Sequence, residues 1–390
     1  MGDRKIPRNK ENDYSLETAA EKRAFVTQVT GSDLSHVGQY SLPPESVAGN
    51  CENFMGITQM PLGVAGPLQV NGEHASGEFY IPLATTEGTL VASYNRGMRA
   101  ITESGGIKTT VFDDYMQRAP AFRFSSAREV KDFMFWFDEN YDAIKAEAES
   151  TSSIASLEFV QRWPMHNNLY MRWNYTTGDA AGQNMVSKAT DHACRWILAN
   201  YPGDILFYAF SGGMDTDKKQ SNINDLYSRG KRVVAELVLK KDVLKNLLRA
   251  DAQTIQKVRN ISSEGSQLAG ASYTGGHSAN AIAAFFIATG QDEANVVESH
   301  AGQTYTEVLE NGDLYWSWTM PSLIVATYGG GTGLATQREC LEMLGCFGKG
   351  KAKKLAEIAA AVVAAGDVSI TNAIVAGEFV NSHETYGRNR

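Results

Sequence analysis

Residues 82–97 read PLATTEGTLVASYNRG and contain the segment on which the fold and the chemistry of this chain depend. Apolar residues up to Leu83 predict a strand over 79–83, the small residues after it predict a turn, and a helix is expected to open near Leu90. Glu87 lies in that turn among small and apolar residues, an environment in which a carboxyl holds its proton more tightly than in water. Such a group acts as an acid.

The same residues also support a purely structural role for Glu87. Thr85 or Thr86 could cap the helix, which would leave Glu87 in the first turn, where the helix dipole favours negative charge. Because most carboxylates in proteins are not strongly perturbed, the local sequence alone favours the capping role. The rest of the chain has to decide between the two roles.

The composition is that of a globular protein. The chain has 390 residues, 43% of them hydrophobic, which is enough for two or three domains with cores. Its net charge is -8 with lysine and arginine dispersed, so no nucleic-acid partner is expected. Residues 1–23 are mostly polar and the longest apolar stretch, 359–365, is far shorter than a membrane span. We therefore expect no membrane partner and a cytoplasmic protein.

The cysteines predict neither a metal site nor a disulfide framework. Cys51, Cys194, Cys340 and Cys346 show no paired C-x-x-C spacing and have no histidine cluster beside them. They are expected to be buried thiols, and no bound metal is expected.

The first half of the chain shows three kinds of organisation. A charged helical pattern over 15–27 predicts a helical arm, and Asn71-Gly72 between apolar runs predicts a β-hairpin. Between 108 and 210 the order strand, helix, strand, strand, helix, strand is that of a ferredoxin-like unit. The corresponding ranges are 108–112, 127–149, 154–162, 169–176, 184–200 and 205–210.

The second half predicts a mixed region of helices and strands. Its expected elements are strands over 231–239 and 314–318, helices over 243–258 and 277–289, and a glycine-rich loop over 328–333 that three helices follow.

Two polar loops offer further chemistry. Residues 177–184 read TGDAAGQN between a strand and a helix, where small residues let an anion approach backbone N–H groups. This turn is not the G-x-G-x-x-G fingerprint, and an ordinary glycine-rich turn is the more common interpretation. Residues 211–219 read SGGMDTDKK, in which a lysine beside Asp217 is suited to gripping a carboxylate or oxyanion, although such charge runs are more often solvated.

Taken together, the motifs of this chain resemble those of the hydroxymethylglutaryl-CoA reductase family. They are ENFMG (52–56), GVAGPL (63–68), ATTEG (84–88), LVAS (90–93), NRG (95–97), GDA (178–180), NMVSK (184–188), DKK (217–219), His277 with Ala279-Asn280, GQD (290–292), MPS (320–322), GGGT (329–332), MLG (343–345) and SH (382–383). They occur in the family's order over about residues 40–390, which makes the resemblance highly specific as to fold.

The resemblance implies an α+β fold, in which a large domain surrounds a central helix and a ferredoxin-like nucleotide-binding domain is inserted into it. In this chain we expect a helical arm over 1–45, a large substrate- and CoA-binding domain over 46–107 and 211–390, and the inserted NAD(P)-binding domain over 108–210. The inserted domain agrees with the alternation of strands and helices read independently from the sequence.

The family's catalytic residues correspond to Glu87, Lys218, Asp292 and His383, and all four are present. By resemblance, the activity is the four-electron, NAD(P)H-dependent reduction of (S)-3-hydroxy-3-methylglutaryl-CoA to mevalonate and free CoA. Lys218 would neutralise the oxyanion that the first hydride creates, with Asp292 holding its charge and orientation. His383 would protonate the departing CoA thiolate, and Glu87 would protonate the aldehyde oxygen as the second hydride arrives.

The resemblance also implies which residues bind the substrates. Acyl contacts are expected from Arg118, Ser211, Asp217, Lys219 and Asn280, and CoA contacts from Ser93, Asn95, Arg96 and Arg99. Nucleotide contacts are expected from Ser152, Ser153, Asp179, Ala180, Gly182, Asn184, Met185 and Ser187. NADPH is the expected cofactor, with NADH not excluded. Because active sites in this family lie between subunits, a homodimer or homotetramer is expected.

The nucleotide-binding region departs from the family pattern. Ala181 and Gln183 stand where the family has methionines. Ser153 stands where NADPH-using members carry an arginine for the ribose 2′-phosphate, so a charge-assisted contact of roughly 1.5–3 kcal/mol is absent. Cofactor preference therefore stays open.

The acyl-binding region departs as well. Residues 258–263 contain no lysine, although the family has one there that helps bind the substrate's carboxylate. Glu264 adds an acid beside this stretch, and Arg259 could compensate. The alternatives are therefore a reductase of a related acyl-CoA in a specialised pathway, or a non-catalytic CoA-binding homologue, against which the complete catalytic set argues.

Overall fold

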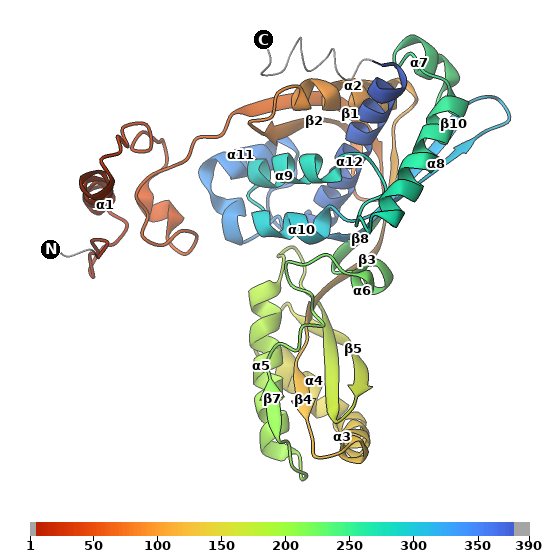
Figure 1. Ribbon diagram of the computed structural model, residues 1–390. Coiled ribbons are helices and arrows are strands. Elements are labelled where there is room, and N and C mark those ends of the chain that lie inside the picture. Colours follow the sequence, from red (N-terminus) through yellow and green to blue (C-terminus); the bar gives the residue numbers. More distant parts are fainter. Residues whose placement is uncertain (1–4, 378–390) are drawn as a thin grey trace.

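The computed structural model describes residues 5–377, which form an N-terminal arm and two packed bodies (Figure 1). In the arm, α1 (Leu16–Thr30) begins after Ser15, whose side chain accepts a hydrogen bond from Thr18 N, and it ends at Gly31 in the left-handed conformation. The expected helix is thus confirmed and runs past its expected end. The arm, which also holds η1 (Pro44–Val47), lies to one side of the larger body in Figure 1.

The larger body is built around α12 (Ala352–Val375), whose side chains are almost all buried. Small residues let its neighbours approach closely: a Cβ added at Gly97 of α2 (Leu90–Glu103) would lie 1.8 Å from the carbonyl oxygen of Ala365. At 24 residues, α12 is long and apolar enough to span a membrane, so the expectation that no segment has that length is wrong. However, 89% of its most apolar window is buried inside the protein, as in the core helix of a globular domain.

The predicted β-hairpin is confirmed. Strands β1 (Leu62–Asn71) and β2 (Ser76–Ala84) pair antiparallel, and Gly72 N donates to Ala75 O at the turn. Glu357 of α12 accepts hydrogen bonds from the backbone N–H groups of residues 73, 74 and 75. The hairpin is therefore tied at its tip to the central helix.

A second sheet connects the two bodies, with the strand order β7-β4-β6-β3-β8-β10-β9 and β5 paired to β6. Strand β3 (Lys108–Arg118) pairs with β8 (Gly230–Leu239) over most of its length and with β6 (Asn168–Thr176) at its end. Next come β10 (Leu314–Leu323) and β9 (Gln303–Val308), a strand that the sequence did not predict. Because β3 belongs to both bodies, the residue limits of the inserted domain stay a prediction.

The smaller body has the antiparallel order β7-β4-β6-β5, the arrangement of a ferredoxin-like unit. Its other elements are β4 (Ala121–Arg123), α3 (Ala127–Glu139), α4 (Tyr141–Glu149), β5 (Ser156–Met165), α5 (Gln183–Asn200) and β7 (Phe207–Ala209). The expected first strand, 108–112, lies within β3, which continues to Arg118. Pro120, which has no N–H to donate, separates β3 from β4, a strand that the sequence did not predict. Asn140 separates the expected first helix into α3 and α4.

The larger body contains further helices between α2 and α12. They are α6 (Asn222–Tyr227), α7 (Lys241–Asn246), α8 (Ala252–Leu268), α9 (Ser278–Thr289), η2 (Glu293–Asn295), α10 (Val296–Ser299), η3 (Gly330–Gly333) and α11 (Ala335–Met343). The single helix expected over 243–258 is wrong, because the chain turns at Arg249 (φ 54) and Asp251 caps a new helix by accepting from Thr254 N. Within residues 334–377, two helices follow the glycine-rich loop where three were expected.

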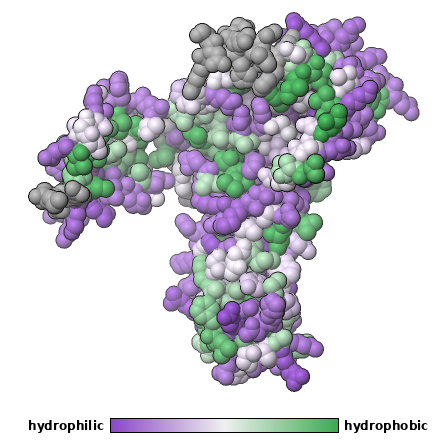
Figure 2. Space-filling model, in the orientation of Figure 1, coloured by the Kyte–Doolittle hydropathy of each residue, from purple (hydrophilic) through white to green (hydrophobic). Residues whose placement is uncertain are grey.

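The face drawn in Figure 2 is mostly hydrophilic, with hydrophobic residues in separate patches. On the arm, Leu16 and Val29 are exposed. Of the four cysteines, Cys51 is exposed and the other three are buried, so the expectation of buried thiols is wrong for Cys51, which lies on the irregular segment after η1.

Candidate active site

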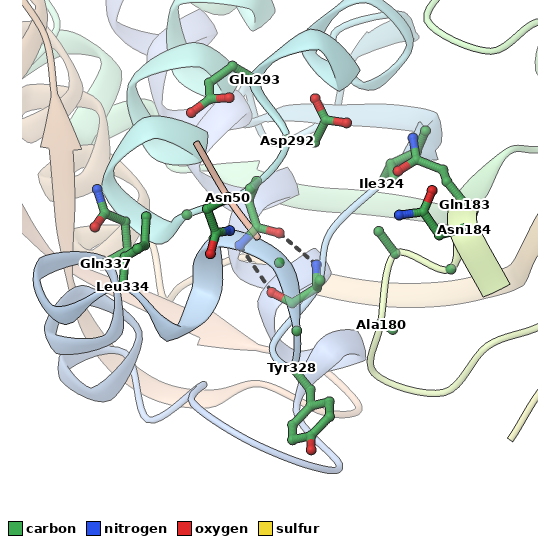
Figure 3. A pocket seen from close by; sticks show the side chains of 18 of the residues that line it. Asn50, Ala180, Gln183, Asn184, Asp292, Glu293, Ile324, Tyr328, Leu334 and Gln337 are labelled. Carbon is green, nitrogen blue, oxygen red and sulfur yellow. Dashed lines mark hydrogen bonds between the residues drawn. The ribbon is translucent and has the colours of Figure 1, made fainter. Parts of the chain in front are cut away.

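A cleft of about 630 Å³ lies where the two bodies meet. One wall is the glycine-rich turn and the first residues of α5 (residues 180–185), and the other is the segment after α9 (290–293) with the triple-glycine loop (329–331). Figure 3 shows Asp292 and Glu293 from one wall and Gln183 and Asn184 from the other. Glycines on both walls leave room for a ligand to approach the backbone.

Lys218 and Asp292 form an ion pair at this cleft, with Nζ 2.6 Å from Oδ2. Asp292 follows α9 directly: Gly290 ends that helix in the left-handed conformation, and Asp292 Oδ1 then accepts from Ala294 N. The two side chains are 41% and 36% exposed, so the pair is open to a ligand. The arrangement places a cation where an anionic oxygen could be neutralised.

Glu87 lies at the other end of α9. Asn280, in the first turn of that helix, donates from Nδ2 to both carboxylate oxygens of Glu87, at 2.9 and 3.1 Å. About nine helical residues separate Asn280 from the end of α9, a rise of roughly 14 Å. Among the described residues, no hydrogen bond or ion pair joins Glu87 to Lys218. Of the expected catalytic residues, the single chain therefore pairs Lys218 with Asp292 at one end of α9. At the other end it places Glu87 beside Asn280, an expected acyl contact.

The capping role considered for Glu87 is wrong. The helix that follows is capped by Thr89 in the left-handed conformation (φ 70), with no side-chain hydrogen bond. Thr85 instead accepts from Glu87 N within the turn. Glu87 precedes the helix and is exposed, so the burial suggested by its apolar sequence neighbours is not found in the single chain.

Arg118 is held by groups inside the site. Its Nη1 lies 2.9 Å from Asp215 Oδ2, and its Nη2 donates to Ser187 Oγ at 2.5 Å. The Arg118 and Asp215 side chains are only 12% and 3% exposed. Sequence reasoning missed Asp215, whose only signal was its place in the loop 211–219. Ser187, expected to contact nucleotide, is thus also a partner of the expected acyl-binding arginine.

Three other expected acyl contacts, Ser211, Asp217 and Lys219, lie on the loop 211–219 that also carries Asp215. Asp217 pairs with the buried Arg229 (Oδ1 to Nη2, 2.6 Å), and Lys219 Nζ donates to the carbonyl oxygen of Asp217. Ser211 and Lys219 are exposed. Asp217 therefore acts within the protein as a partner of Arg229.

Comparison with known proteins explains this combination of residues. A sequence model of the hydroxymethylglutaryl-coenzyme A reductase family matches residues 18–388. The chain belongs to this family. It is 45% identical over 387 residues to the 3-hydroxy-3-methylglutaryl-coenzyme A reductase of Aeropyrum pernix, covering 97% of this chain and 91% of that protein. The protein of the same name from Methanocaldococcus jannaschii is 43% identical over 373 residues, covering 94% and 92%.

A solved structure shares the fold. The class II 3-hydroxy-3-methylglutaryl-CoA reductase from Streptococcus pneumoniae, bound to NADPH in open conformations, matches with a TM-score of 0.70 at 20% identity. The match covers 94% of this chain and 100% of that one. The predicted α+β class and the resemblance to the reductase family are confirmed. The family reduces hydroxymethylglutaryl-CoA to mevalonate with NAD(P)H.

The turn expected to bind nucleotide is built from glycines and a helix N-terminus. Gly178 (φ 61) and Gly182 (φ 89) adopt conformations that disfavour other residues, and α5 begins directly after Gly182. A Cβ on Gly178 would lie 3.2 Å from the Ile154 side chain, so the loop with Ser152 and Ser153 lies beside the turn. Of the expected nucleotide contacts, Ala180, Gly182, Asn184 and Met185 line the cleft.

Asp179 has a structural function that the sequence did not indicate. Its carboxylate accepts hydrogen bonds from the backbone N–H groups of residues 350, 351 and 352, where α12 begins. Burial by itself raises the pKa of Asp179, but these donors outweigh it, so the pKa is lowered overall. The glycine-rich turn is therefore fixed to the start of the central helix by a charged side chain.

The expected CoA-binding residues lie along α2. Ser93 Oγ and Arg96 Nε both donate to Ser369 Oγ of α12, and Asn95 Oδ1 accepts from Gly66 N. Arg99 is exposed and paired with Glu103. Three of these four side chains thus also hold α2 against its neighbours.

His383, the expected donor to the departing thiolate, lies outside the described residues. Arg259 is buried and donates to Ser263 Oγ, Thr304 Oγ1 and the carbonyl oxygen of Thr274. It does not line the cleft. Its hydrogen bonds therefore join α8 to the neighbouring residues Thr274 and Thr304.

One group of side chains meets the spacing of a metal site. Carboxylate and imidazole atoms of Glu73, His74 and Glu357 lie within 4.8 Å of one another. Glu357 already accepts three backbone N–H groups, which explains its buried position without a cation.

Proposed function

We propose that this chain is itself a reductase of 3-hydroxy-3-methylglutaryl-CoA, releasing mevalonate and free CoA at the expense of two molecules of NAD(P)H. The observation that carries the proposal is the Lys218–Asp292 ion pair at the edge of the cleft, opposite the glycine-rich turn. Membership of the family supplies the reaction class, and this pair supplies the charge that the reaction requires.

Lys218 is proposed to neutralise charge on the substrate. Addition of hydride to a thioester carbonyl, the chemistry that bound NAD(P)H supplies, leaves a hemithioacetal oxygen with negative charge. A lysine held at one end of its side chain by Asp292 is oriented before that charge appears, so little reorganisation is needed. Asp292 is proposed to orient Lys218.

Glu87 and His383 are proposed to move protons. Collapse of the hemithioacetal expels CoA thiolate, which leaves more easily when it is protonated. His383 is proposed to donate this proton, because an imidazole can carry a transferable proton near neutral pH. The aldehyde oxygen then needs a proton, and Glu87 is proposed to provide it. Two hydrogen bonds from Asn280 hold the Glu87 carboxyl group in one orientation.

The residues of the cleft fit a nicotinamide dinucleotide. The N-terminus of an 18-residue helix and two positive-φ glycines favour a phosphate group, and the cleft leads from them to Asp292. NADPH is the proposed nucleotide. NADH is the alternative, because Ser153 is exposed beside the turn and offers no charge to a ribose 2′-phosphate.

A second copy of the chain is proposed to complete the site, in a homodimer or homotetramer. The separation of Glu87 from Lys218 along α9 supports this, because one chain leaves the two groups without a shared contact. The arm points away from the body and exposes Leu16 and Val29, which another copy could cover. A cytoplasmic location is proposed, since α12 is already buried within the fold.

A related acyl-CoA is the second candidate substrate. The buried contacts of Arg259 favour it, because they leave residues 258–263 without a cation for a free carboxylate. Binding of a hydroxymethylglutaryl group would then depend on Arg118 and Lys219.

The deciding experiment follows nicotinamide absorbance when purified protein receives hydroxymethylglutaryl-CoA with NADPH or with NADH. Oxidation of either nucleotide is expected, with mevalonate and CoA as products. Failure with both nucleotides would refute the proposal, and turnover of another acyl-CoA alone would select the second candidate. The substitution Ser153→Arg tests which nucleotide the protein prefers. It is expected to raise kcat/KM for NADPH relative to NADH by about tenfold or more, because arginine would bind the ribose 2′-phosphate.

A further inference from the structure

The loop that carries Lys218 has a conformation that its own residues disfavour. Thr216 (φ 51) and Lys218 (φ 57) both lie in the left-handed region, and neither is glycine. Thr216 is β-branched, for which this region is especially unfavourable. Contacts from outside the loop must therefore hold it in place.

Glu298 of α10 provides one such contact from the interior. Its Oε1 accepts a hydrogen bond from the backbone N of Lys218 at 2.5 Å. Glu298 is only 1% exposed, and its other carboxylate oxygen has no partner among the described protein atoms. A buried carboxylate is costly unless a cation faces it.

Arg229 is the cation that faces Glu298, and it also binds Asp217, the residue before Lys218. Its Nε lies 3.4 Å from Glu298 Oε1, and its Nη2 lies 2.6 Å from Asp217 Oδ1. Its Nη1 donates to the carbonyl oxygen of Gln117 in β3. The Arg229 side chain is fully buried. Two opposite buried charges thus fix Asp217 by its side chain and Lys218 by its backbone.

The same short segment holds both ends of Lys218. Asp292, which binds Nζ, and Glu298, which binds the backbone N, lie on the continuous stretch formed by η2 and α10. A displacement of that stretch would move both attachment points together. The position of the whole Lys218 residue, from its backbone N to its Nζ, therefore depends on the single stretch formed by η2 and α10.

We propose that Glu298 and Arg229 are positioning residues that hold Lys218 in its left-handed conformation, so that its ammonium group faces Asp292. Stability alone does not account for this pair, because buried ion pairs can often be replaced by apolar side chains without loss of stability. The inference rests on the proposed function of Lys218.

The test compares Glu298→Ala with Glu298→Gln. Glutamine keeps an oxygen that can accept from Lys218 N, and alanine removes it. We expect Glu298→Ala to lower kcat at least tenfold with the KM for nucleotide unchanged, and Glu298→Gln to restore most of that loss. Hydrogen–deuterium exchange of residues 215–219 is expected to accelerate in the alanine variant and to stay slow in the glutamine variant.

Asp313→Ala is the matched control. Asp313 is also buried, accepts a backbone N–H from Lys241 and faces Lys240, but it lies at the turn between β9 and β10. The inference would be overturned if the Glu298→Ala variant kept the kcat of the parent protein and residues 215–219 still exchanged slowly. An equal loss of kcat in Asp313→Ala, at a matched fall in unfolding temperature, would also overturn it. If the parent protein lacks reductase activity, the proposed function fails, and the exchange comparison still decides whether Glu298 holds the loop.

Discussion

The loop around Lys218 and the turn around Glu87 differ in what holds them. Beneath Lys218, fully desolvated charges bind both the side chain of Asp217 and the backbone of the loop. Around Glu87, the contacts are a threonine hydroxyl and an asparagine amide at the surface. One loop is thus built rigidly within the chain, and the other is supported by neutral groups in contact with water.

In the proposed homo-oligomer, this difference would match a site that two copies of the chain share. A group that must already be in place when charge develops benefits from rigid internal support. A group that faces a second copy can obtain part of its environment from that copy. The comparison therefore predicts that substitutions near Lys218 affect a single chain strongly, and that substitutions near Glu87 depend on assembly.

Lys218→Ala is expected to cause the largest loss, on the order of a thousandfold in kcat, because no other cation pairs with Asp292 among the described residues. Lys218→Arg keeps the charge with a different shape and is expected to recover only part of the rate. Steady-state kinetics with the preferred nucleotide provide the measurement. Equal rates in the alanine variant and the parent would refute the assigned role.

Glu87→Gln is expected to lower kcat about a hundredfold, the usual contribution of a positioned acid, with little change in thermal unfolding. The single side-chain oxygen of glutamine can still accept one hydrogen bond from Asn280, so the loss would report mainly the missing proton. Glu78→Gln is the control, since Glu78 is exposed on strand β2, which precedes the turn, and is not among the expected site residues. A large fall in unfolding temperature with Glu87→Gln would contradict the description of a lightly supported turn.

Local sequence predicted the elements around both regions better than the contacts between them. The Asn71-Gly72 hairpin, the helix start at Leu90 and the strand order of the smaller body all follow from turn chemistry and periodicity. The break of the expected helix near Arg249 did not, because no proline or glycine marks it. Tertiary packing decides such a position.

The contacts that hold these site residues in place could not be predicted from the sequence. Glu298 binds a residue 80 positions away, and no pattern in the sequence connects them. Lys218 and Asp292 were paired only through resemblance to the reductase family, and their distance required the structure. Asp179 and Asp217 were expected to contact ligands, and the structure shows what else they bind: the start of α12 and the buried Arg229.

Asn280→Ala is expected to lower kcat about tenfold, because two hydrogen bonds to a charged group are lost at a site open to water. Asn280→Asp keeps the size of the side chain and places a second negative charge beside Glu87. It is therefore expected to lower kcat more than Asn280→Ala does. Kinetics measured across protein concentration would separate orientation from assembly. No change with either variant would mean that something other than Asn280 orients Glu87.

Thr85→Val is expected to have the smallest effect, about threefold or less in kcat. The valine removes the hydroxyl that accepts from Glu87 N, but this N–H lies in an exposed turn and water can replace the lost acceptor. Thr85→Ser keeps the hydroxyl and is expected to match the parent. If Thr85→Val instead lost as much activity as Glu298→Ala, the turn around Glu87 would be as dependent on a single contact as the loop around Lys218, and the contrast between them would not hold.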